Sequence, residues 1–397
     1  MTTDWNKHHC LGELSVETFL EDYWQQKPLL VRNAFPDLVS PVSAEELAGL
    51  ACEDGVNARL VLEKGKDRNW QAEFAPIPEE RFGELPETGW SLLVSDIERH
   101  VPEAAFLLKP FRFIPDWRID DLMVSYAPPG GSVGPHTDEY DVFLIQLSGQ
   151  RLWKISEDYK PDTLCGTDLC ILEGFDAQHE WLLSPGDMLY LPPRVAHHGI
   201  AQDAGGEHCL TASVGFRAPS LKAMTADYVN YLNEHVHGSQ RYRDSQPQAA
   251  AHHAQISDAT VEHFIDYLRQ GLSTQPEQVR EWLGRFSSDN SNFEEQRPEN
   301  PPLALDALLA QIKQHGLAQS PWSNFLFADT EDGAILFVDG ESYKTNKAFA
   351  RMLCDDRQID SHALLQFLEQ EKDTDKDAQC LLAIFTTGSL ILGNAEA

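Results

Sequence analysis

Residues 134–156 read GPHTDEYDVFLIQLSGQRLWKIS, and this stretch decides the fold. Two short apolar runs, VFLIQL and RLWKIS, lie on either side of a Ser-Gly turn. Their length and their β-branched and aromatic content predict two strands of a hairpin. A bend rich in glycine and proline precedes the hairpin, and His136 and Asp138 lie on the extended segment between the bend and the first strand.

The same pattern of short apolar runs and turns extends from about residue 119 to residue 217. Apolar runs are separated by PPGG, SGQ, SPGD and GG turns, and they cover residues 120–127, 141–147, 151–156, 187–192 and 209–216. Such alternation predicts antiparallel hairpins. A single flat sheet would leave exposed edges, so we expect the strands to close into a double-sheet jelly roll or barrel.

The flanking segments are predicted to be mainly helical. Residues 1–115 are interpreted as helices and loops, with Ser15 as the N-cap of one helix and Ser43 of another. Amphipathic helices are predicted at 220–236, 258–272 and 276–286, with apolar spacings that suit a small bundle, packed on itself or on a second copy. Residues 287–302 are polar and rich in proline, as in a linker.

The last hundred residues predict a smaller αβ unit of roughly winged-helix size. It would contain a hairpin with a type I′ turn at Asp339-Gly340. The fold class is therefore α+β. The predicted division is a β-rich domain with a helical N-terminal elaboration over 1–218, a helical region over 219–290, a linker over 291–302 and an αβ domain over 303–397.

Charge and composition exclude several functional classes. The 397-residue chain has 63 acidic and 31 basic residues, a formal charge of −32. Phosphate contacts need clustered Lys and Arg, so broad nucleic-acid binding is not expected. Residues 300–397 hold 7 Lys and Arg against 15 Asp and Glu, which argues against DNA binding by that unit too. The acidity suits a basic partner or solubility alone, and both explanations remain.

No stretch is long and apolar enough for a membrane span or a signal core, so a cytoplasmic protein is the expectation. The seven cysteines are scattered and odd in number. This pattern fits reduced thiols rather than a disulfide framework, and Cys165 and Cys170 are interpreted as loop or core thiols.

His136 and Asp138 become a candidate metal site when a third ligand is added. An H-x-D spacing alone is weak evidence, but residues two apart on an extended segment point the same way. Further along the chain, a tight turn at Pro185-Gly186-Asp187, a buried strand and a proline stop are followed by His197 and His198. Two histidines and a carboxylate on rigid strands would form the facial triad of non-haem Fe(II) oxygenases, which leaves positions open for a chelating cosubstrate and O2.

Only one of the two adjacent histidines can point inward if both lie on one strand. We assign His197, at the strand entrance, and expect His198 to be solvated or to play a supporting role. A dicarboxylate cosubstrate bound to iron at one end would need a cation at the other. Arg151 offers a bidentate partner with a permanent charge, whereas Lys154 has the opposite parity on its strand and a surface role is expected. Thr211 and Ser213 could add hydroxyl hydrogen bonds, or be ordinary strand hydroxyls.

The stretch KPFRFIPDWRIDDLMVSYAPPGGSVGPHTDEYDVFLIQLSGQRLWKIS (109–156) resembles the bacterial ribosomal oxygenases of the Jumonji-C group, as do SPGDMLYLPPRVAHHGIA (184–201) and SVGFRAPS (213–220). The likeness is dense from about 107 to 220, and the domain order fits nearly the whole chain. Two features depart from the family pattern. The segment after His197 is longer, and Thr211 stands where an amide side chain is expected.

The resemblance implies a cupin-like double-stranded β-helix with iron on His136, Asp138 and His197 and 2-oxoglutarate on Arg151. It also implies a helical region after residue 219 that forms a homodimer, and a winged-helix-like C-terminal domain without DNA function. The implied activity is hydroxylation of an arginine side chain in large-subunit ribosomal protein L16. An arginine substrate would need an acidic or aromatic pocket, for which the candidates are Asp121, Tyr140 and Asp141.

Three alternatives remain at this point. The same chemistry could act on a ribosomal histidine or demethylate lysine, because the iron ligands are common to these reactions. The chain could be a cupin-type isomerase or dioxygenase that does not use 2-oxoglutarate. It could also be a scaffold without catalytic activity.

Overall fold

The computed structural model describes residues 9–66, 69–206, 208–235, 241–243, 249, 252–272, 274–370 and 375–393. The chain divides between Ala218 and Pro219 into two compact units. Parts of the helical region predicted at 219–290 lie outside the described residues, and its boundary with the linker stays a prediction.

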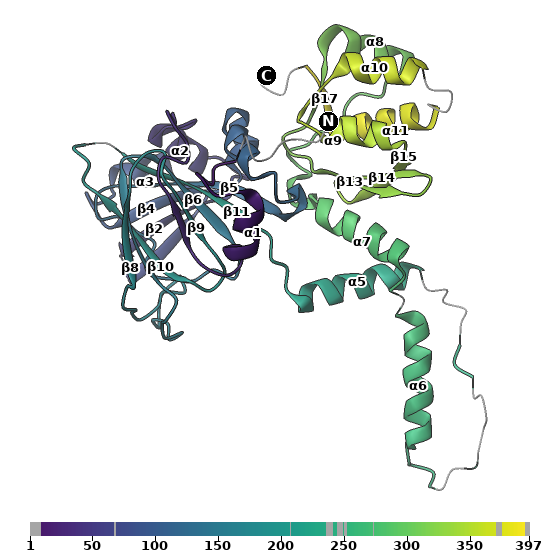
Figure 1. The fold of residues 1–397 in the computed structure, drawn as a ribbon, viewed down its shortest axis with the longest axis horizontal. Helices are drawn as coiled ribbons and strands as arrows, with labels where there is room; N and C mark the ends of the chain where they lie inside the picture. Colours follow the sequence, from purple (N-terminus) through teal and green to yellow (C-terminus); the bar gives the residue numbers. More distant parts are fainter. Residues whose placement is uncertain are drawn as a thin grey trace. The chain divides into compact units, whose positions relative to one another are not determined.

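The first unit contains two facing β-sheets (Figure 1). The larger sheet has eight strands in the order β1-β9-β6-β11-β5-β4-β2-β3, and the smaller has the order β10-β7-β8. The strands are β1 Leu29–Val31, β2 Ala58–Lys64, β3 Asn69–Phe74, β4 Trp90–Val94, β5 Ile119–Ala127, β6 Val142–Ser148, β7 Gln150–Ser156, β8 His179–Leu183, β9 Met188–Leu191, β10 Ala196–Gln202 and β11 Cys209–Phe216.

The strand pairs are antiparallel throughout this unit, as in a jelly roll. The prediction that β6 and β7 form a hairpin is wrong, because they do not pair with each other. The chain turns at Gly149, where φ is +62°, and passes from the larger sheet, in which β6 pairs with β9 and β11, to the smaller one, in which β7 pairs with β8 and β10. Between the sheets is an apolar cluster to which β6, β7, β8 and β9 all contribute: Val142, Leu144, Trp153, Ile155, Leu183, Leu189, Leu191 and Val195. The predicted double-stranded β-helix is confirmed.

The outer face of the larger sheet is covered by the N-terminal segment, and the main core of the unit lies there. Phe19 of α1 and Leu47 of α2 are fully buried in it. Serine caps start both helices, since Ser15 accepts from the Thr18 amide and Ser43 forms a full capping box with Glu46. The helices are α1 Val16–Asp22, α2 Ala44–Ala51, α3 Glu79–Gly83 and α4 Ile97–His100, followed by 3-10 turns at Pro102–Leu107, Lys109–Phe111 and Asp116–Arg118.

The prediction of helices and loops alone for residues 1–115 is wrong. Strands β2, β3 and β4 extend the larger sheet beyond β5, and β1 completes its other edge. The run Leu60-Val61-Leu62 is buried on both faces, because Leu60 and Leu62 join the main core and Val61 joins a cluster on the opposite face. Such a strand does not show the alternation that reveals a half-buried one.

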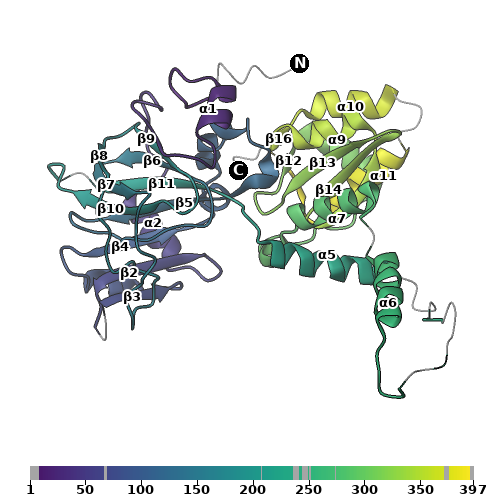
Figure 2. The same cartoon turned by 60° about the horizontal axis from the view of Figure 1, so that its bottom comes forward.

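The second unit combines helices with two small sheets. The helix α7 packs on the sheet β13-β14-β15 (Figure 2), and Gly284 of α7 lies directly against the ring of Phe337, where no side chain would fit. Both Asp339 and Gly340 have positive φ, so the predicted type I′ turn is present. The elements are α5 Leu221–His235, α6 Asp258–Gly271, α7 Pro276–Ser288, α8 Leu305–His315, β12 Leu317–Gln319, β13 Phe325–Thr330, β14 Gly333–Val338, β15 Glu341–Thr345, α9 Lys347–Cys354, β16 Gln358–Ile359, α10 Ser361–Gln370, α11 Asp375–Thr386 and β17 Leu390–Leu392, with a 3-10 turn at Ser291–Phe293.

Two of the helices differ in how their apolar sides are covered. Trp282 of α7 is buried against α5, and its indole N–H donates to Asp227. By contrast, α6 exposes several large apolar side chains. Among the described residues, no helix is both long enough and apolar enough to cross a bilayer.

Candidate metal centre

His136 and His197 face each other through direct backbone pairing. The His136 amide donates to the His197 carbonyl at 3.0 Å, and the His197 amide donates back at 2.9 Å. His197 is the second residue of β10, whereas His136 lies on the segment that leads into β6. Directly paired residues project to the same side of a ladder, so the two imidazoles lie next to each other with ring centroids 4.2 Å apart.

The turn before His136 depends on Gly134. Its φ of +81° lies in the left-handed region, and a Cβ at this position would come within 2.7 Å of Ile171 Cδ1. Glycine is therefore required both for the backbone conformation and for the close packing of Ile171. The bend places His136 opposite His197, and Asp138 follows two residues later on the same segment.

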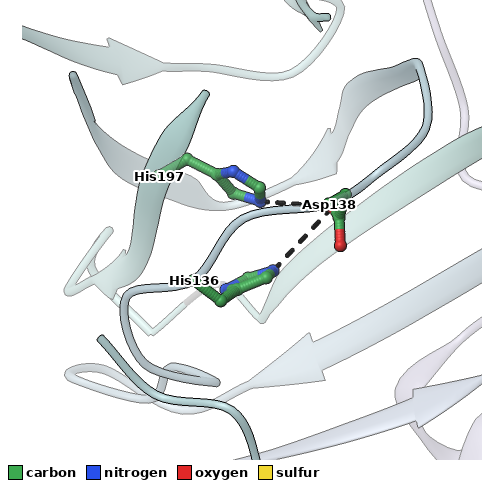
Figure 3. Close-up of side chains that lie close together, drawn as sticks. All are labelled: His136, Asp138 and His197. Atoms are coloured by element: carbon green, nitrogen blue, oxygen red, sulfur yellow. Dashed lines mark ion pairs between the residues drawn. The ribbon is translucent and has the colours of Figure 1, made fainter. Parts of the chain in front are cut away.

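The three predicted ligands converge (Figure 3). Asp138 Oδ2 lies 3.6 Å from His197 Nε2 and 4.0 Å from His136 Nε2, and the ligand atoms of all three lie within 4.8 Å of one another. In the described part of the chain this is the single group of three or more such side chains that could hold a metal ion. The His136 and Asp138 side chains are 26% and 21% exposed, so the group is accessible from one side.

Backbone carbonyls fix the chemical form of both histidines. His136 Nδ1 lies 2.9 Å from the Gly134 carbonyl, and His197 Nδ1 lies 2.9 Å from the Val195 carbonyl. A carbonyl only accepts, so each Nδ1 carries the hydrogen and each Nε2 presents its lone pair toward Asp138. Burial, followed by the neighbouring His136, lowers the pKa of His197 to about 4. Two neutral imidazole nitrogens and a carboxylate oxygen are a ligand set for a divalent transition metal.

The structure also separates His197 from His198. His197 is buried with 3% exposure, whereas His198 is half-buried and has the opposite parity on β10. His198 pairs with Lys154 of β7, while His197 pairs with Ile155. Only His197 belongs to the ligand group.

Arg151 lies on the same inner face as His197, four residues along the ladder. It pairs with Ala201, and its side chain is 3% exposed. Its Nε and Nη2 atoms are buried and have no hydrogen-bond partner among the described residues. A buried guanidinium without partners for these atoms is costly, and an anion at this position would satisfy it. Lys154, by contrast, pairs with Glu180 at 3.3 Å on the surface.

Trp153 fills the space between Arg151 and His197. Its ring centroid lies 5.9 Å from that of His197, and the Arg151 guanidinium lies 5.8 Å from the ring. Opposite it is Gly199, where an added Cβ would come within 2.7 Å of the indole. Sequence reasoning missed Trp153 and Gly199 as parts of the site. The alternation of Arg151, Trp153 and Ile155 along one strand was the signal that could have identified Trp153.

The two predicted hydroxyl residues differ in what their surroundings allow. The Gln146 amide nitrogen donates to the carbonyls of Ser148 and Leu210, so its oxygen must be the acceptor for the Thr211 hydroxyl at 3.2 Å. In this structure the Thr211 hydroxyl donates to Gln146, and its hydrogen bond to a cosubstrate stays a prediction. Ser213 is buried two residues further along β11 with the same parity, and it stays a candidate.

Asp121 and Tyr140 come together beside the metal ligands. A Cβ on Gly215 would lie 3.3 Å from the Asp121 carboxylate and 3.9 Å from the Tyr140 ring. Burial raises the pKa of Asp121 to about 7, with a further contribution from Asp96. Burial and the carboxylates of Asp138 and Asp121 raise the pKa of Tyr140. These two side chains offer an aromatic surface and a carboxyl group near the ligand Asp138.

Asp141 does not belong to this group, and its prediction as a substrate-binding residue is wrong. The side chain is fully buried, and its carboxylate accepts hydrogen bonds from the Tyr190 hydroxyl at 2.6 Å and the Gln25 amide at 2.9 Å. Arg118 lies 3.7 Å away. These partners hold the segment after Asp138 against the N-terminal helix region, so Asp141 has a structural role.

Two family models match the chain. Residues 106–224 match the JmjC domain, and residues 268–383 match the ROXA-like winged helix. The first match contains all three converging residues and Arg151. The second confirms the predicted winged-helix-like unit, and it begins before α7, which packs on the sheet of that unit.

Known proteins resemble the chain over most of its length. Ribosomal protein uL16 3-hydroxylase from Escherichia coli is 38% identical over 298 residues, which is 75% of this chain and 77% of the relative. The crystal structure of the E. coli ribosomal oxygenase YcfD superimposes with a TM-score of 0.79 at 31% identity, covering 96% of this chain and 98% of that one. A structure of YcfD in complex with cobalt and 2-oxoglutarate gives a TM-score of 0.78 at 30% identity, with the same coverage.

Proposed function

The chain belongs to the JmjC ribosomal oxygenases, and on this basis we propose that it is an Fe(II)- and 2-oxoglutarate-dependent hydroxylase of an arginine side chain in ribosomal protein uL16. A hydroxylase of this kind needs a ferrous ion, a keto acid and O2, together with a pocket that holds the target carbon beside the metal. Residues of the first unit can be assigned to the ferrous ion, to the keto acid and to the substrate pocket.

We assign the metal to His136, Asp138 and His197. Their two Nε2 atoms and one carboxylate oxygen would occupy one face of the coordination sphere and leave the other positions for small molecules. The carbonyls of Gly134 and Val195 hold both rings in the ligating form before the metal arrives.

We assign the distal carboxylate of 2-oxoglutarate to Arg151. A guanidinium presents two parallel N–H donors to a carboxylate, and the buried Nε and Nη2 atoms are available for this role. When bound, the ferrous ion and 2-oxoglutarate together supply the oxidising chemistry by which O2 converts a substrate C–H bond to C–OH and the keto acid to succinate and CO2. The Trp153 ring excludes water around the guanidinium.

We assign the substrate side chain to Asp121 and Tyr140, and Ser213 stays a candidate for a hydrogen bond to 2-oxoglutarate. The Asp121 carboxyl would pair with an arginine guanidinium, and the Tyr140 ring would pack against the aliphatic part of the same side chain. Burial and the nearby carboxylate of Asp96 raise the pKa of Asp121, so a cationic side chain bound beside Asp121 would offset the cost of its negative charge. The negative charge of the whole chain would attract a basic ribosomal protein.

One observation carries this proposal. The single described group of metal-ligating side chains shares the inner face of the β7–β10 ladder with a buried arginine whose Nε and Nη2 lack partners. A silent scaffold would not be expected to retain a buried, unsatisfied cation at that position. A cupin enzyme without 2-oxoglutarate has no use for Arg151 either.

The test uses the full-length protein with Fe(II), 2-oxoglutarate and purified uL16 from its own host. Tandem mass spectrometry should find a gain of about 16 Da on one arginine of uL16. The gain should be absent with the His197→Ala variant and present with His198→Ala, which is the matched control on the same strand. A gain on histidine, or loss of a methyl group from lysine with release of formaldehyde, would instead support the two alternative reactions. No modification of uL16 by the wild-type protein would contradict the proposal.

We further propose that the protein works in the cytoplasm as a homodimer and does not bind DNA directly. The substrate is a component of the large ribosomal subunit, and α6 offers an apolar surface for a second copy. The acidic C-terminal unit lacks the charge that phosphate binding requires.

A further inference from the structure

A short antiparallel flap covers the bend that carries His136, and it contains two cysteines. We define the flap as residues 162–173. Thr163 and Leu172 form an antiparallel bridge, flanked by a hydrogen bond from the Leu164 amide to the Ile171 carbonyl at 2.8 Å and one from the Glu173 amide to the Asp162 carbonyl at 2.9 Å. The bridge is therefore a non-hydrogen-bonded pair of the ladder.

Cys165 and Cys170 each lie one residue beyond the pair Leu164 and Ile171, which is joined by the hydrogen bond from the Leu164 amide. The ladder ends at that pair, because the Ile171 amide donates to the Leu169 carbonyl at 3.0 Å, and the chain turns back through Gly166 (φ +74°). The Thr167 hydroxyl lies 2.6 Å from the Leu169 carbonyl and 3.3 Å from the Leu164 carbonyl, which holds the two sides of the loop together. The two cysteines therefore lie at the two ends of a closed loop, residues 166–169, and a disulfide requires only that their Cα atoms come within about 7 Å of each other.

Accessibility singles out the same two side chains. All seven cysteines lie in the described part of the chain, and none of them is in a disulfide. Cys165 and Cys170 are exposed, whereas the others are buried or half-buried. A small oxidant dissolved in water therefore reaches these two thiols first.

The flap is connected directly to the metal-binding segment. The Leu172 amide donates to the Pro135 carbonyl at 2.8 Å, one residue before His136. Ile171 is buried against Gly134 and Trp70. At the tip, the Asp168 amide donates to the Trp70 carbonyl, and its carboxylate accepts from the Ala72 amide. The flap and the bend that carries His136 therefore share a backbone hydrogen bond and a buried apolar contact.

We propose that Cys165 and Cys170 form a reversible disulfide within the flap when the protein meets hydrogen peroxide. One thiolate attacks a peroxide oxygen to give a sulfenic acid, and the O–O bond breaks with release of water. The second thiolate then attacks that sulfur and expels hydroxide, which takes up a proton to form a second water. Two thiols are oxidised to one disulfide, and one peroxide is reduced to two waters. The bond closes the tip of the flap and rigidifies the loop next to the metal segment.

The test uses the full-length protein in a chelating buffer, so that no iron reacts with peroxide and the result does not depend on the proposed hydroxylase activity. Cleavage before each aspartate separates the peptides DTLCGT (162–167) and DLCILEGF (168–175). After peroxide treatment we expect these two peptides to be joined, with a mass about 2 Da below the sum of the reduced peptides. Dithiothreitol should separate them.

Titration of the unfolded protein with a thiol reagent gives the second readout. The wild-type protein should lose two of its seven free thiols, and Cys52→Ser should lose two of the remaining six. Cys165→Ser and Cys170→Ser should each lose no thiol to a disulfide within the chain. Three results would overturn the proposal. The two peptides could stay separate, either cysteine could be linked to another cysteine or to a second chain, or the cysteines could be oxidised to sulfinic acid without linkage.

Discussion

At the scale of single residues, the site depends on how its polar atoms are already satisfied. Both ligand histidines give their Nδ1 hydrogen to a backbone carbonyl, so neither ring can turn over without losing a hydrogen bond. Arg151 shows the opposite condition, because its Nε and Nη2 are buried without a partner. The pattern is that of a site organised for a metal and an anion before either is bound.

The Arg151→Ala change tests the anion role. Removing one partner of a buried, hydrogen-bonded charge pair costs about 3–5 kcal/mol, so we expect 2-oxoglutarate to bind at least ~100-fold more weakly. The dissociation constant can be measured by calorimetry on the Mn(II)-loaded protein. Lys154→Ala, three residues along β7, should bind 2-oxoglutarate like the wild type. Equal affinity of the wild type and Arg151→Ala would exclude this anchor.

Asp121→Asn should stabilise the metal-free protein at high pH. The pKa of Asp121 is raised from 3.8 to about 7 in the folded state. The folded protein therefore holds this proton more tightly than the unfolded chain, and the contribution to stability is full below pH 4 and falls as the pH rises through 7. The variant avoids this loss, so its unfolding free energy should exceed that of the wild type by on the order of 2–4 kcal/mol at pH 8 and by much less at pH 5.

Denaturant titrations at the two pH values measure this difference. Asp120→Asn is the matched control, because Asp120 is exposed and pairs with Arg217 on the surface. It should change stability by less than about 0.5 kcal/mol at either pH. An equal effect of Asp121→Asn at pH 5 and pH 8 would show that the carboxyl is not destabilised by burial.

Sequence reasoning identified the residues whose role follows from local spacing. His136 and Asp138 are two apart on an extended segment, and His197 follows a proline stop, so their convergence could be predicted. The role of Asp141 was misjudged, and the hydrogen bond from Thr211 to Gln146 was missed, because the partners are distant in sequence. Gln25 lies 116 residues from Asp141, and Gln146 lies 65 residues from Thr211. Hydrogen-bond networks of this kind are not visible in a pattern of residue types.

At the scale of elements, the β7–β10 ladder builds the site by matching large residues with small ones. Trp153 and Arg151 on β7 pair with Gly199 and Ala201 on β10. The small partners leave space above the sheet that the indole and the guanidinium occupy. His197 pairs with Ile155 at the end of the same ladder, so one pair of strands positions a metal ligand and the proposed cosubstrate anchor.

Strands and helices differed in how well the sequence predicted them. The strands from β5 to β11 were largely predicted because glycine-rich turns separate them. The exception is β8, whose residues are mostly exposed. The N-terminal strands β2, β3 and β4 were missed. They pair with one another and with β5, and charged residues such as Arg59 and Lys64 obscure their pattern.

The helix α6 should form the contact between two copies of the chain. Its exposed apolar residues fall at helical spacing on one face: Val261, Phe264, Ile265, Leu268 and, just after the helix, Leu272. Light scattering should give the wild-type protein a mass of about twice 44.6 kDa. Phe264→Asp combined with Leu268→Asp should give a monomer, because two carboxylates cannot be buried without partners.

The control for this experiment is Gln270→Asp, which adds a carboxylate on the polar side of α6. This variant should remain dimeric. If the wild-type protein is monomeric, the proposed contact does not exist. If the Phe264→Asp/Leu268→Asp variant stays dimeric, the contact lies elsewhere in the chain.

At the scale of the whole molecule, the dominant property is the charge of −32. A field of this sign accelerates encounters with basic partners and is screened by salt. It also disfavours contact with phosphate backbones, including those of the ribosomal RNA around an assembled substrate. On the function proposed above, we therefore expect the substrate to be the free ribosomal protein, before RNA covers its basic surface.

Substrate capture should therefore depend on ionic strength. Between about 50 and 250 mM NaCl, where the Debye length falls to about 6 Å, we expect the KM for a uL16 fragment to rise several-fold while kcat changes little. The matched substrate is the same fragment with its flanking Lys and Arg replaced by Gln, and the target arginine retained. At low salt, the KM for this substituted fragment should be higher than the KM for the native fragment. It should change little as the salt concentration rises. A salt-independent KM for the native fragment would contradict electrostatic attraction.

The most direct test of the central claim is a titration of the metal-free protein with Co(II) in the absence of O2, followed by its visible absorption. The wild-type protein should bind one equivalent, and its absorption bands should shift when 2-oxoglutarate is added. His198→Ala should behave in the same way, whereas His197→Ala should lose saturable binding. A wild-type protein that binds no Co(II), or a His197→Ala variant with an unchanged spectrum, would show that His136, Asp138 and His197 are not the metal site.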